Sequence, residues 1–406
     1  MAEIVKRRPV TRWVAPLAAV ALVGVGAVVT TAAASADDAP VLPPRSAEQL
    51  LVDLHQPTTT AFSGEIAVHS DLGLPDVAGL LGGGTSDTGV VPPHAADMVA
   101  GDATGIPALG GLTGLLTGDH TLRVWFDAPE RSRVAVVGNR EESDVVKNGT
   151  DLWVWQSAGS QVLHATLPTP DEVAARLPSQ SELPDEVLAQ LPKTPQEAAA
   201  ALLDAVGTTT AVTSESTASV AGRPAYLLVA TPKTPGTLVA RVVVAIDSET
   251  HVPLRLEVYS TQRTQPAASI GFTSVSFETP SADVFAFTPP AGATVTELPE
   301  DLKDLTGGPT TRPDGARPDV TTVGEGWATV AILTPPAGVP ATAPGSSGAP
   351  GVSGLLDALP QVSGPWGSGH ALAGTLFSVL VADDGRIAVG AVPVATLEDA
   401  LAGTTP

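Results

Sequence analysis

The part of the sequence that most constrains the fold is a run of four consecutive large apolar residues: Leu152, Trp153, Val154 and Trp155. It comes just after Asn148-Gly149, a pair that tolerates the positive φ of a type I′ turn, so a β-hairpin is predicted here. A strand that is apolar on both faces needs cover on both faces, whereas an exposed meander alternates apolar with polar residues. The sequence therefore predicts a second layer over this sheet, either a helix or a bound apolar ligand.

The hairpin is part of a longer antiparallel meander. Residues 120–168 are predicted to form four successive strands with turns between them. Its first strand alternates so that Leu122, Val124 and Phe126 share one face, and alternation gives Leu254 and Leu256 a common face in a later strand. Tightly packed apolar strands and a cavity for an acyl chain both produce this pattern, and the residues alone leave both open.

The N-terminus has the pattern of a targeting segment. Four basic residues precede an apolar run from Trp13 to Ala34, and Ala34-Ser35-Ala36 matches an A-x-A cleavage site. Because the run approaches the length of a membrane span, residues 1–36 are predicted to be either a cleaved signal peptide or a retained single-span anchor. In both cases the rest of the chain is expected to lie outside the cytoplasm, secreted or tethered to the cell membrane.

Charge and cysteine usage exclude several classes of function. The formal net charge is −22, and removal of residues 1–36, which hold four basic and one acidic residue, would lower it to −25. Such a chain is not expected to bind nucleic acid or to dock electrostatically on anionic lipids. Cysteine is absent, which excludes disulfides, thiolate metal sites and a lipid-modified cysteine.

No catalytic signature accompanies these features. The seven histidines are scattered without an H-x-x-x-H pair, and the sequence lacks a G-x-S-x-G elbow, a P-loop and a dinucleotide fingerprint. Asp383-Asp384-Gly385 fits a hairpin turn better than a calcium loop, and Glu141, Glu142 and Asp144 are expected on a solvated face. We therefore predict a protein that is not an enzyme and that holds no metal and no cofactor.

The remaining segments give the expected organisation. Ser46 is predicted to cap a helix over residues 46–55, and a helix containing Leu397 and Leu401 is predicted at the C-terminus. Between them the sequence favours a flexible insertion over 73–118, a lid of short amphipathic helices over 170–206, a linker over 298–320 and a small unit over 321–404.

Several of these features together resemble a known family. The NGxxLWxW hairpin after an N-terminal helix, and the F-x-F-x-P-P-x-G segment of residues 285–292, resemble the LolA-type lipoprotein-carrier superfamily over residues 42–297. The C-terminal unit, with Gly390-Ala391-Val392-Pro393 before its last helix, is similar to that of the MucB/RseB-like regulators of sigma-E factor. The resemblance implies an α+β fold: a curved antiparallel half-barrel, closed by short helices around an apolar cavity, with a small α+β C-terminal domain.

The resemblance also implies a function. We expect an exported binding protein that holds an acyl chain or a lipoprotein and regulates an anti-sigma factor in an envelope stress response. A lipid or lipoprotein carrier, and a structural envelope module with a filled core and no ligand, are the alternatives. Sheet parity selects the candidate lining residues, although the opposite parity remains open: Leu122, Val124, Phe126, Leu152, Val154, Leu254 and Leu256.

Overall fold

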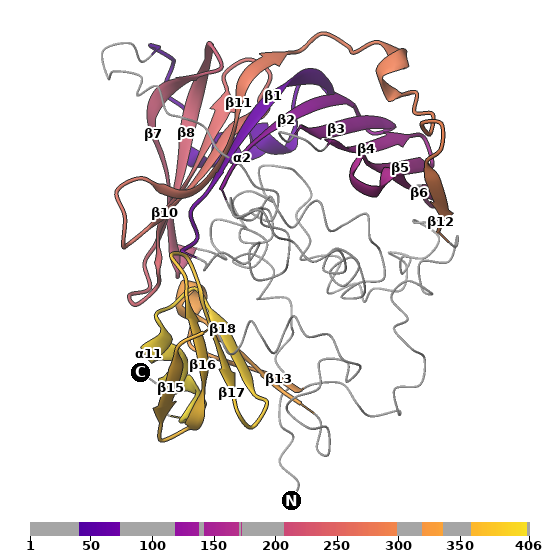
Figure 1. The fold of residues 1–406 in the computed structure, drawn as a ribbon. Helices are drawn as coiled ribbons and strands as arrows, with labels where there is room; N and C mark the ends of the chain where they lie inside the picture. The colour runs from indigo at the N-terminus through magenta and orange to yellow at the C-terminus, as the bar shows by residue number, and fades with distance from the viewer. Residues whose placement is uncertain are drawn as a thin grey trace, which may run out of the picture.

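A computed structural model describes residues 40–73, 118–137, 142–169, 172, 207–298, 319–335 and 359–403. These residues form a twelve-stranded sheet and a six-stranded sheet (Figure 1). The expected N-terminal targeting segment, most of the insertion at 73–118, nearly all of the lid at 170–206 and most of the linker at 298–320 lie outside the described residues.

The larger sheet has the order β12-β6-β5-β4-β3-β2-β1-β11-β10-β9-β8-β7. All neighbours are antiparallel except β12, which pairs in parallel with β6. In chain order its strands are β1 (Ala61–Ser70), β2 (Gly118–Asp127), β3 (Arg131–Val137), β4 (Glu142–Asn148), β5 (Asp151–Gln156), β6 (Gln161–Thr166), β7 (Thr210–Val220), β8 (Arg223–Pro232), β9 (Val239–Asp247), β10 (Pro253–Ser260), β11 (Pro266–Ser276) and β12 (Thr294–Glu297). The meander over residues 120–168 thus contains five strands, where the sequence predicted four.

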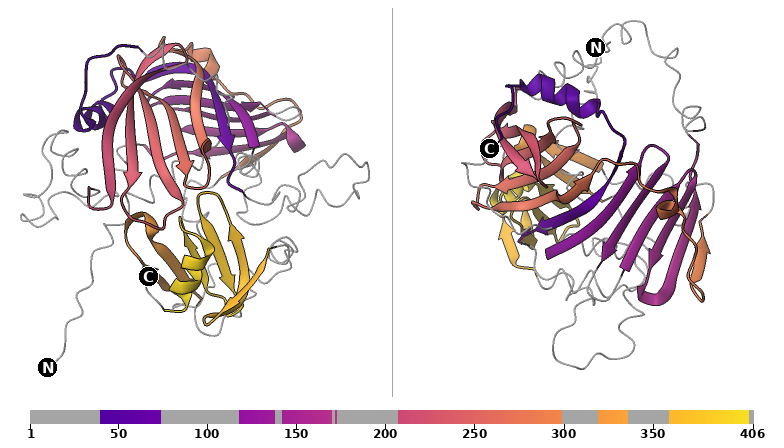
Figure 2. Two further views of the ribbon diagram at one scale, coloured as in Figure 1. Left: turned by 90° about the vertical axis from the view of Figure 1, so that its left-hand side faces the viewer. Right: turned by 90° about the horizontal axis from the view of Figure 1, so that it is seen from above.

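This sheet bends strongly along its length. In Figures 1 and 2, β7–β11 form one limb, β2–β6 form the other, and β1 lies between them. Register shifts occur where β1 meets β11, between Glu65 and Ile66, and at both ends of β10 against β9. Bulges of this kind bend a strand and increase its local twist, so they account for part of the curvature.

Helix α2 (Ala47–His55) begins at the predicted cap. The Ser46 side chain accepts a hydrogen bond from the backbone N–H of Gln49, and the Gln49 side chain accepts one from the backbone N–H of Ser46. Leu50 on this helix is fully buried in a cluster with Tyr226, Leu228 and Ile246. The apolar face of α2 therefore packs against β7 and β8, with Ile246 of β9 in the same cluster.

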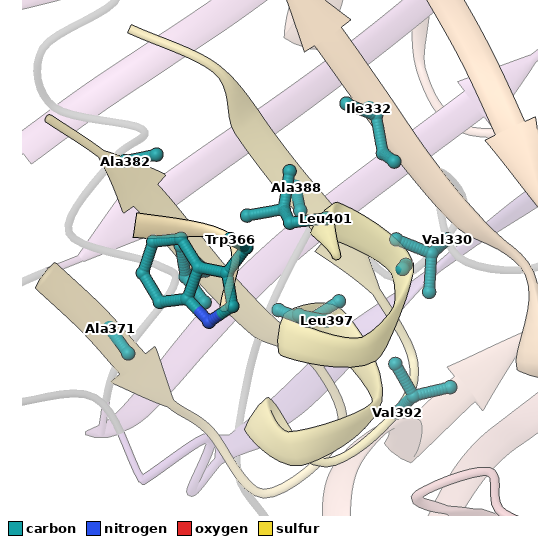
Figure 3. Close-up of a cluster of buried hydrophobic side chains, with 11 residues drawn as sticks. Val330, Ile332, Trp366, Ala371, Ala382, Ala388, Val392, Leu397 and Leu401 are labelled. Carbon is teal, nitrogen blue, oxygen red and sulfur yellow. The ribbon is translucent and has the colours of Figure 1, made fainter. Parts of the chain in front are cut away.

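The smaller sheet has the order β13-β14-β18-β17-β16-β15. Its strands are β13 (Asp319–Val323), β14 (Val330–Thr334), β15 (Gln361–Gly364), β16 (Gly367–Ala373), β17 (Ser378–Ala382) and β18 (Ile387–Gly390). Helix α11 (Val394–Leu401) packs on one face of this sheet, where Leu397 and Leu380 are fully buried (Figure 3). The predicted C-terminal helix is thus confirmed, and the Asp383-Asp384-Gly385 sequence forms the predicted tight turn between β17 and β18.

The two sheets contact each other through buried groups. Trp327 donates its indole N–H to Thr210 Oγ1 over 2.8 Å, and Ser260 Oγ donates to the carbonyl of Thr375 over 2.7 Å. Around these bonds lies one hydrophobic cluster, which we call the inter-sheet cluster; it contains Val239, Val258, Ala267, Ala268, Trp327 and Leu376, with Leu72, Val242, Phe377 and Ala391 packed against it.

The predicted α+β fold class with closing helices is wrong. Strands dominate the described residues, which contain two α-helices, and the larger sheet is not closed. Helix α2 packs on β7 and β8, and α11 packs on the smaller sheet. The two-sided apolar strands predicted a second layer over the sheet. Residues 277–293, which contain no α-helix, supply part of it and contact β3 and β4 through the 3-10 turn η8 (Ala282–Phe285).

Candidate functional site: an apolar face of the curved sheet

One face of β1–β6 carries aligned apolar side chains. The strand register places one residue from each of β2 to β6 in a single cross-strand row, since residues paired directly across antiparallel strands point to the same side. The members of this row are Val124, Val134, Val145, Val154 and Leu163. Val124 is 2% exposed, Val154 is 6% exposed and Val145 is half-buried. We call this side of the sheet the apolar face.

The candidate residues of the meander all lie on this face. Leu122 pairs with Val136 beside the central row, and Leu152 pairs with Lys147 and Ala165 on the other side of it. Phe126 pairs with Phe62 of β1. The structure thus places these five candidate residues on one side of the sheet, as their alternation in the sequence predicted: Leu122, Val124, Phe126, Leu152 and Val154. Their contact with a ligand stays a proposal.

The two candidates on β10 join the same region. Leu256 pairs with Ile270, which pairs with Val68 of β1, so all three share a side of the sheet. Leu254, 1% exposed, belongs to the same hydrophobic cluster as Leu122, Val124 and Val68. Val154 belongs to a separate cluster with Leu163, and Leu152 and Leu256 are half-buried outside both clusters.

An aromatic group at the end of β1 was not predicted from the sequence. The rings of Phe62 and Phe126 stack with centroids 4.8 Å apart, and Phe272 meets Phe62 edge to face at 5.8 Å. Gly64 leaves room for this arrangement, because a Cβ there would lie 2.9 Å from Cδ1 of Phe272. The alternation in FSGEIAV, residues 62–68, places Phe62 and Gly64 on one face. The sequence does not show that Phe272 meets them, because this contact depends on the pairing of β1 with β11.

The opposite face of β2–β6 holds polar anchors for the stretch 277–293. Arg133 pairs with Asp144, lies 5.7 Å from the Trp125 ring centroid and donates to the carbonyl of Val284 over 3.2 Å. Fully buried Phe285 lies under Arg131, at 5.4 Å from the guanidinium carbon to the ring centroid. The expectation of a solvated Asp144 is therefore wrong, since this residue is 3% exposed; burial raises its pKa, and Arg133 opposes the rise.

A histidine joins the last two strands at the edge of the sheet. Nδ1 of His164 lies 2.7 Å from Oε2 of Glu297 on β12, and Nε2 lies 3.0 Å from Oδ1 of Asp151 on β5. The imidazole stacks on Trp153 with ring centroids 3.8 Å apart. Burial lowers the pKa of His164, but the two carboxylates outweigh this effect and raise it above 6.5. The arrangement joins β5, β6 and β12 through one imidazole.

The polar groups of the apolar face lie beside its central row, Ser143, Gln156 and Gln161 on one side and Ser132 and Lys147 on the other. Lys147 is the charged residue at its margin, and its ammonium donates to the backbone carbonyls of Pro129 and Glu130, over 2.7 and 3.2 Å, at the β2–β3 turn. Within the described part of the chain, no group of three or more His, Asp or Glu side chains could hold a metal ion. Such a surface binds by removing apolar area from water, which contributes about 25 cal/mol per Å².

Neither of the helices in the described ranges has the length and hydropathy needed to cross a bilayer.

Comparison with known proteins gives similarity at the level of fold. No family model and no curated protein matches the sequence. The fold is similar to that of MucB. A structure of the Pseudomonas aeruginosa MucA/MucB complex matches with 14% identity over 87% of this chain and 96% of the matched chain, at a TM-score of 0.39. A crystal structure of MucB alone matches with 14% identity over 90% and 96%, at a TM-score of 0.36.

A more distant similarity concerns the LolA superfamily. The protein NE2245 from Nitrosomonas europaea matches with 12% identity over 60% of this chain and 99% of its own, at a TM-score of 0.21. These neighbours carry the names of the superfamily and branch that the sequence resembles. Because all these TM-scores are below 0.5, function has to be inferred from the residues of this chain itself.

Proposed function

We propose that the chain is an exported, non-enzymatic binding protein that holds an acyl chain, free or carried by a lipoprotein, against the apolar face of β1–β6. The observation that supports this most is the row from Val124 to Leu163, which crosses five strands without a polar interruption. An antiparallel sheet with one solvated face would alternate apolar with polar residues, yet here the opposite face is also packed, through Phe285 and Arg133.

The expected free energy of binding follows from the transfer of methylene groups out of water. Each buried methylene contributes about 0.8 kcal/mol, so about ten of them give about 8 kcal/mol before the entropic cost of association is subtracted. A dissociation constant in the micromolar range or weaker is therefore expected for a single fatty acid. A chain held in this way exchanges readily, which suits a sensor or a carrier.

The partner in this proposal is a membrane-bound anti-sigma factor, and the location is outside the cytoplasm. Both follow from the sequence resemblance to MucB/RseB-like regulators and from the targeting pattern of residues 1–36. A lipoprotein carrier is the second candidate. The buried contacts between the two sheets favour the regulator, since Trp327, Ser260 and Ala391 connect the larger sheet to a further unit that a simple carrier does not need.

Native mass spectrometry of the purified full chain, followed by solvent extraction and lipid analysis, tests the proposal. We expect a co-purifying acyl species, and uptake of a fluorescent 16-carbon fatty acid by the delipidated protein. Val145→Trp fills the centre of the apolar face and should weaken this uptake at least tenfold. Val295→Trp, at a 43% exposed position of edge strand β12, is the matched control and should leave it unchanged.

Absence of any acyl species together with no uptake by the unmodified protein would refute the proposal and leave a packed structural module. Equal uptake by the Val145→Trp variant and the control would move the ligand away from this face.

A further inference from the structure

We propose that the smaller sheet carries a second acyl-binding surface, continuous with the apolar face, so that the ligand is a lipid with more than one acyl chain. This inference rests on the function proposed above. The surface is the side of β14, β16, β17 and β18 that faces away from α11, and we call it the second apolar face. Its apolar residues are Ala331, Leu333, Leu372, Val379, Val381, Ile387 and Val389.

Strand register arranges these residues in two rows. One row runs Leu333–Ile387–Val381, and the next runs Ala331–Val389–Val379–Leu372. All seven side chains are half-buried, and none belongs to a hydrophobic cluster of the described residues. The residues that alternate with them include Ala388, which is fully buried beside Leu397 of α11 (Figure 3), and Leu380, which is also fully buried. The smaller sheet thus presents an apolar surface on each side, and only one of them has its cover among the described elements.

The second apolar face reaches the larger sheet through apolar side chains at the inter-sheet cluster. Phe377 follows the alternation of Val379 and Val381, and Ala391 follows that of Val389. Both Phe377 and Ala391 pack against the inter-sheet cluster, which contains Val258 and Ala268 of the larger sheet.

On the larger sheet, further apolar residues on the same side connect the inter-sheet cluster to the candidate binding residues. Val258 pairs with Ala268, and one step along the same strands Leu256 pairs with Ile270, which pairs with Val68. Val68 shares a cluster with Leu122 and Val124 of the apolar face. The two apolar faces are therefore joined through the inter-sheet cluster.

The small size of the second apolar face and its lack of charged residues favour an acyl chain as its ligand. Four strands spaced by about 4.8 Å, and two residues along each strand, give a footprint of about 14 Å by 7 Å between side-chain positions. A stable protein interface needs about 800 Å² on each partner, which is far more than such a strip offers. The two rows contain no charged residue, and their titratable neighbours, His370 opposite Val381 and Asp383 two residues after it, lie at one end. An extended hydrocarbon chain fits a narrow, uncharged strip of this kind.

The test is photo-crosslinking of the full chain with a neutral two-chain lipid, a diacylglycerol that carries a diazirine in each acyl chain. We expect crosslinked peptides from β2–β5 and also from β17 and β18. Val381→Asp should reduce the crosslinks on the smaller sheet at least tenfold and leave those on β2–β5 in place. Val381→Thr, which keeps the shape and strand propensity of valine, should reduce them several-fold, and it replaces the Asp variant if that variant does not fold.

The outcomes separate this inference from the function on which it rests. Crosslinks confined to β2–β5, with Val381→Asp and Val381→Thr equal to the unmodified protein, would overturn the second surface and keep the proposed function. An absence of crosslinks on both sheets would overturn both. Val295→Asp on the exposed edge strand is the matched control, and loss of smaller-sheet crosslinks in that variant would also count against the assignment.

Discussion

His164 and Glu297 are 133 residues apart in the chain, yet Nδ1 of the imidazole lies 2.7 Å from Oε2 of the carboxylate. Their contact fixes the short edge strand β12 to β6, where all four β12 residues are exposed. Asp151 on β5 provides a second carboxylate at 3.0 Å from Nε2, so the protonated imidazole bridges three strands. The edge of the larger sheet is therefore held by a histidine whose pKa the two carboxylates raise.

This arrangement predicts a pH dependence of stability. The two carboxylates raise the pKa of His164 in the folded chain despite the opposing effect of burial. A raised folded pKa gives stability that is fully present below the unfolded value of about 6.5 and is lost as pH rises through the folded value. Urea unfolding of the His164→Gln variant from pH 5 to 9 should therefore show a smaller loss of stability across this window than the unmodified protein shows.

Val295→Thr, at an exposed position of the same edge strand, is the control, since it removes no titratable group. It should keep the pH dependence of the unmodified protein. If His164→Gln follows the unmodified protein at every pH, the bridge does not contribute to folding.

The buried pair of Arg133 and Asp144 predicts an asymmetric response to substitution. Arg133→Met leaves the Asp144 carboxylate buried without its partner, and breaking such a pair costs about 3–5 kcal/mol. Among the described residues, Arg133 Nε and Asp144 Oδ1 lack a hydrogen-bond partner, so the pair is incompletely satisfied. The double variant Arg133→Met/Asp144→Leu should therefore recover most of the loss.

Chemical unfolding of the two single variants and the double variant measures this coupling. Additive losses in the double variant would show that each residue acts independently.

The aromatic group beside Gly64 predicts that a single methyl group disturbs the apolar face. In Gly64→Ala the new Cβ would lie 2.3 Å from the carbonyl oxygen of Ser274 and 2.9 Å from the Phe272 ring. Overpacking of this kind costs about 1–3 kcal/mol, and it should also weaken fatty acid uptake because Phe272 must move. Gly207→Ala, where a Cβ meets nothing within 4 Å, is the matched control for thermal unfolding and uptake. Equal melting temperatures for the two variants would contradict this packing.

The sequence predicted correctly those elements whose structure depends on interactions between residues close together in the chain. Ser46 with Gln49 specifies the start of α2, and Asn148-Gly149 specifies the turn between β4 and β5, where Gly149 has a φ of 63°. Alternation also placed Leu122, Val124 and Phe126 on one face. These features depend on residues within a few positions of one another.

The features that were missed depend on pairing between distant segments. Asp144 was expected in solvent because its neighbours are acidic, but it is buried and pairs with Arg133 on the adjacent strand. Arg133 is held in turn by the carbonyl of Val284, from the stretch 277–293. The closing helices were expected from periodicity and family resemblance, whereas η8 is a 3-10 turn whose Phe285 fills the space over β3 and β4. No short-range pattern specifies that β12 pairs in parallel with β6.

The contact between Trp327 and Thr210 predicts energetic coupling between the two sheets. The indole N–H donates to Thr210 Oγ1 over 2.8 Å in a buried site, and Trp327 belongs to the inter-sheet cluster. Thr210→Val removes the acceptor and leaves a buried donor unpaired, which costs about 1–3 kcal/mol. Trp327→Phe removes the donor together with part of the ring.

In a double-mutant cycle measured by urea unfolding, the two losses should fall short of additivity by about 1 kcal/mol, the contribution of one buried hydrogen bond. Strict additivity, or two separate unfolding transitions in the unmodified protein, would show that the sheets are not coupled through this bond.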